Sequence, residues 1–469
     1  MAERIVMKFG GSSVGDAESI RQTAAQIYAA HRQGQQVVTV VSAMRGVTDM
    51  LIGATTSAAA GDHAIPEQAK QLLWEKHHLA ASELLPGEFQ GVLGEIQAEL
   101  SNFSNLVMAI SILGEVTPRA MDFIASLGER FSATLVAAYL SAAHGPARAV
   151  MADTLIVTDQ HFGSANPLLA LTGKRVQDSL VPLLESGILP VVTGFMGATR
   201  EGIVTTLGRG GSDYTAAILG HALDADEIWI WSDVDGVLTA DPRIVPTAHP
   251  IAQLSYQEAA ELAYFGAKVL HPKTVRPAVE KNIPIRMLNT FNPAYEGTLI
   301  TRETSTGSAV KAVTSIPGLA LVTVEGRGML GVPGVAARVF GAVAQLGVSV
   351  LMISQGSSEQ SICFVVRQEE SGAVVSALEE SFRLELSQGD IDSIWREEQM
   401  VIVAAVGAAM RGTPGIGGKL FTALGEAGIN VLSIAQGSSE YNVSLIVKQQ
   451  DAHQAVQAIH DAFELSRSK

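Results

Sequence analysis

The sequence is poor in cysteine, in basic residues and in long apolar runs, and each shortage excludes a class of protein. Cys363 is the only cysteine, so neither an internal disulfide nor a cysteine metal cluster can form. Lysine and arginine number 32 against 47 acidic residues, and the formal net charge of −15 disfavours nucleic acid and anionic membranes as partners. No apolar run approaches the length of a membrane span, and Met1–Val6 lacks the apolar core of a signal peptide. We therefore expect a cytoplasmic protein.

The 469 residues are instead rich in apolar side chains and glycine, and their length predicts two or three domains. Short apolar runs at 4–9, 37–41, 188–193 and 227–231 predict strands, and a helix capped by Asp16 follows the first of them. Residues 66–140 are predicted to be mostly helical. This alternation indicates a mainly parallel sheet with crossover helices. His77 and His78 lie in a polar helical stretch, where we expect both to be solvated.

An internal repeat follows a polar segment, 301–308, that we interpret as a linker. Gln355-Gly356-Ser357-Ser358-Glu359 recurs 81 residues later as Gln436-Gly437-Ser438-Ser439-Glu440, and the same offset superimposes glycines, prolines and apolar residues without a gap. The copies span about 319–385 and 400–466, and each predicts a strand, a glycine loop, a helix, two strands and a helix. The strand-like segment 310–316 is expected to complete the sheet of the second copy. A purely structural duplication is the alternative.

Three motifs in the first 300 residues are suited to chemistry. Lys8-Phe9-Gly10-Gly11-Ser12-Ser13 places a lysine and exposed N–H groups at a strand end, although a plain tight turn has the same pattern. Gly208-Arg209-Gly210-Gly211-Ser212-Asp213 places an arginine, which matches carboxylates, at a helix start. Trp231-Ser232-Asp233 leaves a buried strand, where open α/β sheets bind ligands. The eleven histidines show no metal-ligand spacing, so we predict no metal ion held by the protein.

Together with Ser42, Thr48, Gly128-Glu129 and the run Phe265–Pro272, these motifs occur in the order typical of the amino acid kinase family, and the chain resembles its aspartate kinases. The repeat resembles paired ACT modules. The tail is similar to that of bifunctional aspartate kinase–homoserine dehydrogenases, and because the chain stops at Lys469 we expect it to lack the dehydrogenase half. The resemblance implies a three-layer α/β/α domain over 1–300 on a mainly parallel sheet, followed over 309–469 by two ferredoxin-like α+β modules.

The resemblance also implies an activity: transfer of the γ-phosphoryl of ATP, with Mg²⁺, to the β-carboxylate of L-aspartate, giving 4-phospho-L-aspartate for lysine, threonine and methionine synthesis. Four residues would be catalytic: Lys8, Arg209, Asp213 and Lys268. Arg209 would bind the α-carboxylate of aspartate, with Ser42, Thr48, Glu129, Ser212 and Asp213 completing that pocket. The nucleotide would contact Lys8, Gly10, Gly11, Ser12, Ser232, Asp233, Leu238, Arg243 and Lys268, although some relatives carry an aromatic residue at Leu238.

The resemblance implies feedback control by an amino-acid effector, threonine rather than lysine. Its binding residues would be Gln355, Ser358, Glu359, Gln436, Ser439 and Glu440. Modules of this kind pair between chains, so a homodimer or larger assembly is expected. Two alternatives remain: another amino acid kinase, such as acetylglutamate kinase or glutamate 5-kinase, and an inactive amino-acid sensor. The first would have less use for Glu129 and Asp213 as ammonium partners, and the intact set of motif residues argues against the second.

Overall fold

The computed structural model describes residues 2–87, 90–266, 270–303, 308–356, 360–437 and 440–466, and the predicted linker 301–308 lies partly outside them. The chain forms two compact units. The first unit comprises Met1–Val237, Ala252–Tyr256 and Leu270–Thr304, and the second comprises Leu238–Ile251, Gln257–Val269 and Ser305–Lys469. Two segments from the predicted catalytic range 1–300 therefore pack in the second unit.

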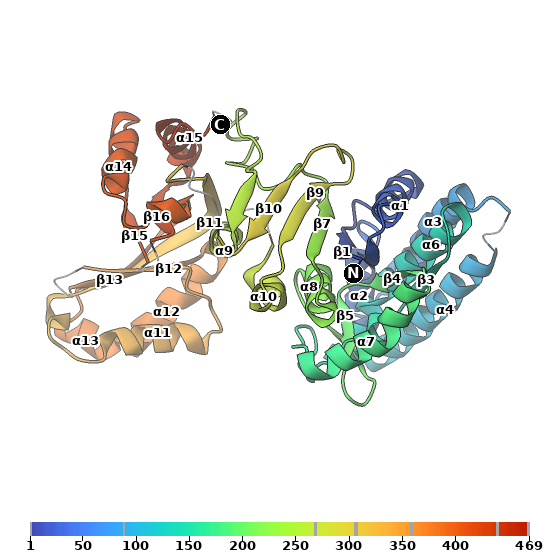
Figure 1. The fold of residues 1–469 in the computed structure, drawn as a ribbon. Coiled ribbons are helices and arrows are strands. Elements are labelled where there is room, and N and C mark those ends of the chain that lie inside the picture. The colour runs from blue at the N-terminus through green and yellow to red at the C-terminus, as the bar shows by residue number, and fades with distance from the viewer. Residues whose placement is uncertain are drawn as a thin grey trace. The chain divides into compact units, whose positions relative to one another are not determined.

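The first unit is built on an eight-stranded sheet with the order β3-β4-β2-β1-β7-β9-β10-β8 (Figure 1). All neighbours run parallel except β9 and β10, which confirms the predicted mainly parallel sheet. The strands are β1 (Arg4–Phe9), β2 (Gln36–Val41), β3 (Ala147–Val150), β4 (Leu189–Thr193), β7 (Glu227–Ser232), β8 (Gln253–Ser255), β9 (Ile285–Asn289) and β10 (Thr298–Thr301). A separate hairpin joins β5 (Met196–Ala198) to β6 (Val204–Thr206).

Helices cover both faces of this sheet, as the strand pattern dictates. Successive side chains of a strand point to opposite faces. Ile5, Met7 and Phe9 of β1 enter a core shared with α1 (Ala17–Arg32) and α6 (Leu127–Ala143). On the other face, α7 (Leu169–Glu185) and α8 (Gly211–Leu223) contact the central strands, with α10 (Pro272–Glu280) beside α8. Asp16 caps α1 by accepting the Ser19 N–H, as predicted.

The stretch predicted to be helical, 66–140, contains α3 (Ala64–Leu84), α4 (Gln90–Leu113), α5 (Pro118–Ala125) and most of α6, while α2 (Val47–Ala59) precedes it.

The prediction that His77 is solvated is wrong. Its side chain is 0% exposed and packs edge-on against Phe131. Its Nδ1 forms a hydrogen bond with the Leu73 carbonyl at 2.6 Å. His77 shares its helical face with Leu73, Ala81 and Leu84, which the polar neighbours obscured. No helix within the described residues is both long and apolar enough to cross a membrane.

The second unit contains a six-stranded antiparallel sheet, β12-β13-β11-β14-β16-β15, which carries both copies of the repeat. The α+β modules are thereby confirmed, each with its own apolar core. The first copy comprises β11 (Ala312–Glu325), α11 (Val335–Gln345), β12 (Met352–Gln355), β13 (Ser361–Arg367), α12 (Ser371–Ser381) and α13 (Arg383–Gln388). The second comprises β14 (Ser393–Val406), α14 (Ile416–Glu426), β15 (Ser433–Ala435), β16 (Asn442–Lys448) and α15 (Ala452–Ala462).

Segments from outside the repeat complete the second copy. The start of β11, 312–316, pairs with residues 402–406 of β14, and Val310 and Val313 enter the same core as Leu445. Ala240 and Val245 of the 238–251 segment belong to that core too.

The helix α9 (Tyr256–Tyr264) is bound to the second copy through Glu258. This side chain is fully buried, and its carboxylate lies 3.2 Å from Lys311 Nζ and accepts the Ala408 N–H at 2.7 Å. A buried carboxylate with such partners holds its helix firmly in place, because breaking the pair would leave an uncompensated buried charge.

The burial of His77 predicts an acid-sensitive stability. Burial lowers the pKa of His77 from 6.5 to about 4, whereas the unfolded chain restores the ordinary value. The unfolded state therefore binds the extra proton between these values, and folding stability falls as the pH drops from about 6.5 to 4, by about 3 kcal/mol in total. His77→Leu should flatten the dependence of the melting temperature on pH across this window. The neighbouring His78→Leu is the control, and an equal flattening in both variants would contradict the assignment.

Candidate active site

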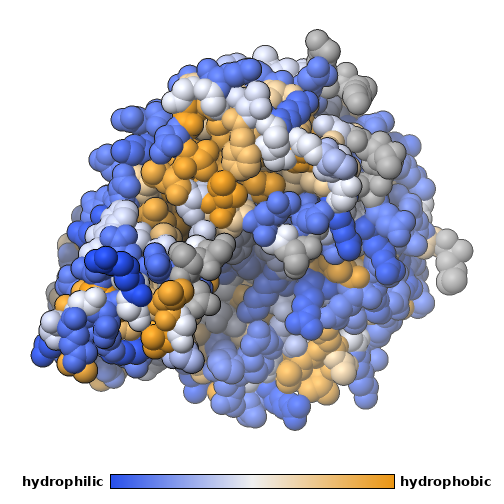
Figure 2. Space-filling view, turned by 90° about the vertical axis from the view of Figure 1, so that its left-hand side faces the viewer, coloured by the Kyte–Doolittle hydropathy of each residue, from blue (hydrophilic) through white to orange (hydrophobic). Residues whose placement is uncertain are grey.

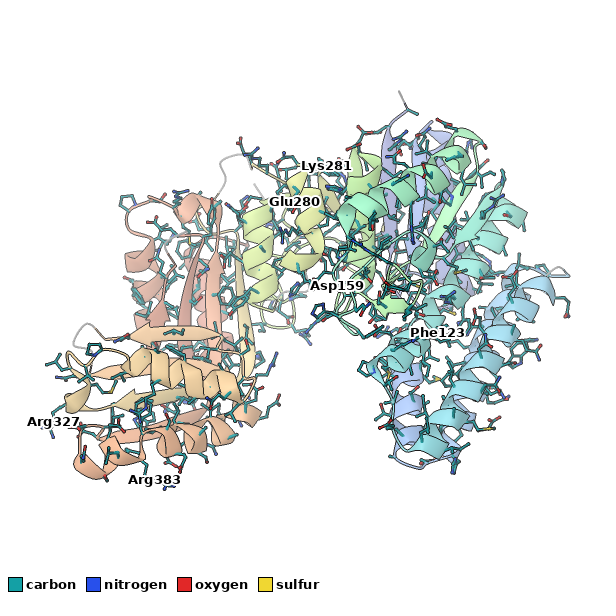
Figure 3. All side chains as sticks on the ribbon, turned by 90° about the horizontal axis from the view of Figure 1, so that it is seen from below. Phe123, Asp159, Glu280, Lys281, Arg327 and Arg383 are labelled. Atoms are coloured by element: carbon teal, nitrogen blue, oxygen red, sulfur yellow. The ribbon has the colours of Figure 1, made fainter. Side chains whose placement is uncertain are left out.

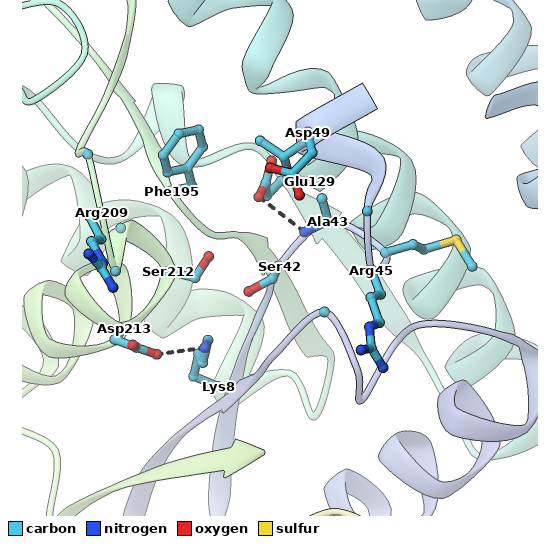
Figure 4. Close-up of a pocket in the computed structure, with 17 residues that line it drawn as sticks. Lys8, Ser42, Ala43, Arg45, Asp49, Glu129, Phe195, Arg209, Ser212 and Asp213 are labelled. Carbon is cyan, nitrogen blue, oxygen red and sulfur yellow. Dashed lines mark hydrogen bonds and ion pairs between the residues drawn. The ribbon is translucent and has the colours of Figure 1, made fainter. Parts of the chain in front are cut away.

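Four strands of the first unit end at one level. Phe9 of β1 pairs with Val41 of β2 and with Trp231 of β7, and Val41 pairs with Thr193 of β4. The loops that follow β1, β2 and β4, together with Glu129 and the segment 208–213, line a pocket of about 330 Å³ (Figure 4). Its lining includes Lys8, Gly11, Ser42, Thr48, Glu129, Arg209, Ser212 and Asp213 from the sequence prediction, all within the first unit.

Lys8 and the glycine turn form one side of this pocket. The Lys8 side chain is 12% exposed, and its Nζ lies 2.6 Å from Asp213 Oδ1 (Figure 4). Gly10 begins a tight turn in which its carbonyl accepts the Ser13 N–H at 3.0 Å. A Cβ at Gly11 would lie 2.9 Å from the Ala43 carbonyl, so only glycine lets the turn approach the loop after β2 this closely.

The start of α8 forms the adjoining side, since its Asp213 is the residue that Lys8 contacts. Gly210 adopts φ +71° and places Gly211 at the first helical position. The Gly211 N–H donates to the Gly208 carbonyl at 2.9 Å, so the next N–H groups of the first turn are the ones available to an anion. Ser212 is buried against Gly194, where a Cβ would lie 2.5 Å from the Ser212 hydroxyl. Arg209 is exposed, and its guanidinium makes no hydrogen bond or ion pair with any residue that the structure describes. A cation with no internal partner is available to an anionic ligand.

Glu129 lies at the bottom of the pocket as a buried acid. It is 4% exposed, and its Oε1 accepts the Ala43 N–H at 3.1 Å. Gly128 makes this approach possible, because a Cβ there would lie 2.7 Å from the Ala43 side chain. Burial raises the pKa of Glu129 to about 8, against the lowering effect of that hydrogen bond and of Lys8. The acid is therefore mostly neutral at pH 7 without a ligand, and an arriving cation would favour its ionised form.

The pocket also contains residues that the sequence prediction missed. Arg45, Asp49 and Phe195 all contribute to its lining. Arg45 and Asp49 lie close in sequence to the predicted residues Ser42 and Thr48, and that position was the available signal. Phe195 follows the buried strand β4 and has φ +69°, a left-handed backbone that is unusual without glycine. Nothing in the sequence marks that conformation.

The residues predicted to contact the nucleotide are divided between the units. In the first, Ser232 ends β7, its carbonyl accepts the Thr290 N–H at 2.9 Å, and Asp233 beside it is exposed. In the second unit, Leu238 forms an isolated antiparallel β-bridge with Pro250. Arg243 is exposed, and its Nη2 donates to the Asp241 carboxylate at 2.6 Å. Lys268 lies outside the described residues.

The predicted effector residues lie at the ends of the edge strands of the second unit. Gln355 ends β12, and Gln436 follows β15, and both are exposed. The Glu440 carboxylate accepts the Gly412 N–H at 2.7 Å and so closes the glycine loop of its own module. Ser358, Glu359 and Ser439 lie outside the described residues.

Comparison with known proteins gives consistent matches along the chain. Residues 3–289 match the model of the amino acid kinase family, and residues 322–382 and 403–463 each match an ACT domain. Bifunctional aspartokinase/homoserine dehydrogenase 2, chloroplastic, of Arabidopsis thaliana is 41% identical over 472 residues, which cover 99% of this chain and 51% of that relative. The chain thus spans about half the length of the first curated relatives it matches.

Two solved structures of E. coli aspartokinase III are similar over almost the whole chain. The complex with aspartate and ADP (R-state) has a TM-score of 0.81 at 30% identity and covers 98% of this chain and 99% of that one. The complex with lysine and aspartate (T-state) has a TM-score of 0.80 at 31% identity and covers 98% and 100%. The resemblance inferred from the motifs is confirmed: the chain belongs to the amino acid kinase family and carries an amino acid kinase domain followed by two ACT domains.

Proposed function

We propose that this protein is an aspartate kinase, which transfers the γ-phosphoryl of ATP to the β-carboxylate of L-aspartate. The observation that carries this proposal is the pocket of Figure 4. It combines the unpartnered Arg209 guanidinium, the buried acid Glu129 and the Lys8–Asp213 pair at one edge of the sheet. The E. coli enzyme solved with aspartate and ADP supports this choice of substrates.

The pocket offers a partner for each charge of an amino acid. Arg209 binds the α-carboxylate, because a guanidinium presents two parallel N–H donors to two carboxylate oxygens. Glu129 binds the α-ammonium, and the ion pair lowers the pKa that burial has raised. Ser42, Thr48 and Ser212 offer neutral hydroxyls from the loop after β2 and from the starts of α2 and α8. The β-carboxylate is then left to face the phosphoryl donor.

Phosphoryl transfer needs positioning and charge neutralisation more than it needs a base. The acceptor carboxylate is ionised at pH 7, and the transferred group spreads negative charge over its oxygens. Lys8 faces this charge, and its pairing with Asp213 holds the ammonium group at the end of β1. Gly10, Gly11 and Ser12 form the turn that lines the phosphates. The Gly10 N–H donates to the Trp231 carbonyl at 3.2 Å, so Gly11 and Ser12 supply the N–H groups, and Mg²⁺ accompanies the nucleotide. Within the first unit, Ser232 and Asp233 complete the proposed nucleotide contacts, while Leu238, Arg243 and Lys268 remain expectations from the family resemblance.

The test of this function is ADP release, measured by a coupled assay with a panel of carboxylic amino acids. Aspartate should be the preferred acceptor. N-acetylglutamate and glutamate test for the other amino acid kinases, and an N-acylated substrate would leave the buried acid Glu129 without an ammonium partner. Turnover with N-acetylglutamate or glutamate alone would reassign the substrate, and no turnover with any acceptor would favour an amino-acid sensor.

We further propose that the ACT domains bind an amino-acid effector and join two chains. Ile353 of β12 and Ile434 of β15 are 50% and 45% exposed on the two edge strands, and unpaired edges are suited to pairing with another chain. Figure 2 shows apolar side chains gathered on one face of the molecule. Threonine is the proposed effector, because the tail is similar to that of the bifunctional relatives and one Glu440 oxygen already accepts the Gly412 N–H. The E. coli relative solved with lysine makes lysine the alternative.

Lys8→Ala should lower kcat by about two to three orders of magnitude, the usual effect of removing one partner of the transition-state charge. The fold should survive, because Lys8 lies at a strand end, as circular dichroism would show. Lys281→Ala is the matched control, since Lys281 also pairs with an aspartate, Asp224, at the C-terminal end of α10. Near-normal turnover of Lys8→Ala would remove Lys8 from the mechanism.

Arg209→Lys should raise KM for aspartate at least tenfold and KM for ATP much less, because lysine cannot form the two-pronged contact with a carboxylate. Steady-state kinetics with each substrate varied in turn measures both constants. Arg200→Lys, at an exposed arginine in the turn between β5 and β6, should change neither. Equal increases in both constants would assign Arg209 to the nucleotide instead.

Gln436→Ala should weaken effector inhibition while leaving the uninhibited kcat nearly unchanged, because Gln436 lies in an ACT domain. A coupling of about 1–3 kcal/mol between the effector and the active conformation corresponds to a several-fold to hundredfold change in affinity. Threonine and lysine are titrated separately into wild type and variant. A wild-type rate that responds to neither amino acid, alone or together, would leave the ACT domains with a role in assembly alone.

A further inference from the structure

Asp122 is a buried carboxylate that the proposed mechanism does not use. It lies on α5 and is 3% exposed. Its Oδ1 accepts the Gly163 N–H at 2.9 Å and the Thr206 hydroxyl at 2.8 Å, while its Oδ2 accepts the Gly163 N–H at 2.9 Å and the Thr206 N–H at 2.8 Å. Acidic side chains are rarely buried this fully unless their partners satisfy them. One carboxylate therefore holds two segments that are distant from α5 in the sequence.

Both segments support the backbone that carries Arg209. Thr206 is the last residue of β6, three positions before Arg209, and its carbonyl accepts the Ala165 N–H at 2.9 Å. Gly208 has φ +79° and lies against Gly163, where a Cβ on Gly208 would be 3.1 Å from the Gly163 carbonyl. Two residues labelled in Figure 3 locate these segments. Asp159 lies at the start of the loop that contains Gly163, and Phe123 is the residue next to Asp122 on α5. The Asp122 contacts thus fix the residues before and beneath the Arg209 turn.

The other end of the connection is Glu129. The Ser126 N–H donates to the Asp122 carbonyl at 3.1 Å, and Ser126 is both the last cap of α5 and the residue before α6, which carries Glu129 in its first turn. Asp122 therefore links the helix pair that positions Glu129 to the strand that positions Arg209. Arg209 has no side-chain partner within the described residues, so the contacts that fix its backbone are what place the start of its side chain in the pocket.

We propose that Asp122 is a positioning residue: it fixes Arg209 relative to Glu129 and so sets the spacing between the two groups that bind the charged ends of the amino-acid substrate. The inference rests on the proposed roles of Arg209 and Glu129. Small displacements of a binding group are costly, since a shift of about 1 Å can reduce catalysis by about a hundredfold. Loss of Asp122 should therefore impair use of the amino acid and not of ATP.

The chemistry of the contacts allows graded variants. Asp122→Ala leaves two backbone N–H groups and a hydroxyl without an acceptor, which costs more than the net value of the hydrogen bonds. Asp122→Asn keeps one oxygen for the two N–H groups if its NH₂ group takes the place of Oδ1 and donates to the Thr206 hydroxyl, which turns to accept. Thr206→Val keeps the shape of residue 206 and removes only one donor. Glu227→Ala is the control, because Glu227 is a half-buried carboxylate paired with Arg286 at the far end of β7.

The test is steady-state kinetics on these variants, with thermal melting to confirm that each is folded. Asp122→Ala should reduce kcat/KM for aspartate about ten- to hundredfold with little change in KM for ATP. Thr206→Val should show a several-fold reduction, and Asp122→Asn should recover most of the wild-type value. Glu227→Ala should melt at a lower temperature without this substrate-specific loss. If Asp122→Ala does not fold, Thr206→Val decides: an unchanged aspartate kcat/KM, or equal losses for both substrates, would overturn the proposal.

A double-mutant cycle shows whether Asp122 acts through Arg209. In an Arg209→Ala background, Asp122→Ala or Thr206→Val should reduce kcat/KM for aspartate less than twofold further, because the group being positioned is gone. Full additivity would overturn the proposal while leaving the proposed function intact. If the substrate panel instead identifies another amino acid, the proposed function fails in that respect, and the same cycle on that substrate gives the same two outcomes for Asp122.

Discussion

The common register of β1, β2, β4 and β7 is the constraint on which the site depends. The loops after parallel strands that end at one level lie at one edge of the sheet, and here those loops contain Gly10, Ser42, Phe195 and Asp233. Side-chain alternation then decides which residues face which layer. Phe9 enters the core beneath α1 and α6, while Lys8 points to the other face and reaches Asp213 of α8. A slip of one residue in β1 would exchange these two side chains, and both the core and the site would be lost.

The charges of Lys8, Asp213 and Glu129 are balanced or suppressed before any ligand arrives. Lys8 and Asp213 neutralise each other, and burial keeps Glu129 mostly neutral at pH 7. Arg209, Arg45 and Asp49 carry charges for which the described residues show no partner, and their sum is positive, which favours the approach of an anion. In the proposed binding mode, an amino acid that brings its own ammonium group would convert Glu129 to a carboxylate, so the full set of charges would form only with the amino acid bound. Glycines at 11 and 128 make this compact arrangement possible, because each occupies a place where a Cβ would collide with Ala43.

Local sequence patterns predicted much of this molecule, and the failures share one cause. The apolar runs of β1, β2, β4 and β7 and the 81-residue repeat are visible in the chain itself, as are Lys8 before a glycine turn and Arg209 between glycines. The burial of His77 depends on which turn of α3 meets Phe131, and the backbone of Phe195 depends on packing around β4. Asp122 gives no local signal at all, since its partners at 163 and 206 are far along the chain. What the sequence hides is contact between distant segments, especially for single polar residues.

The interleaving of the two units bears on how such a protein can be divided or recombined. Two segments, Leu238–Ile251 and Gln257–Val269, belong to the second unit, and the chain returns to the first unit after each of them. From Ser305 onward the chain belongs to the second unit. Val245 is fully buried in the core of the second ACT domain, and Glu258 is buried against Lys311. A recombination junction near residue 300 would therefore divide the core of the second ACT domain and leave the buried Glu258 without Lys311, although the sequence composition suggests a domain boundary there. Exchange of ACT domains between relatives would preserve the fold only if the segments 238–251 and 257–269 were exchanged together with the ACT domains.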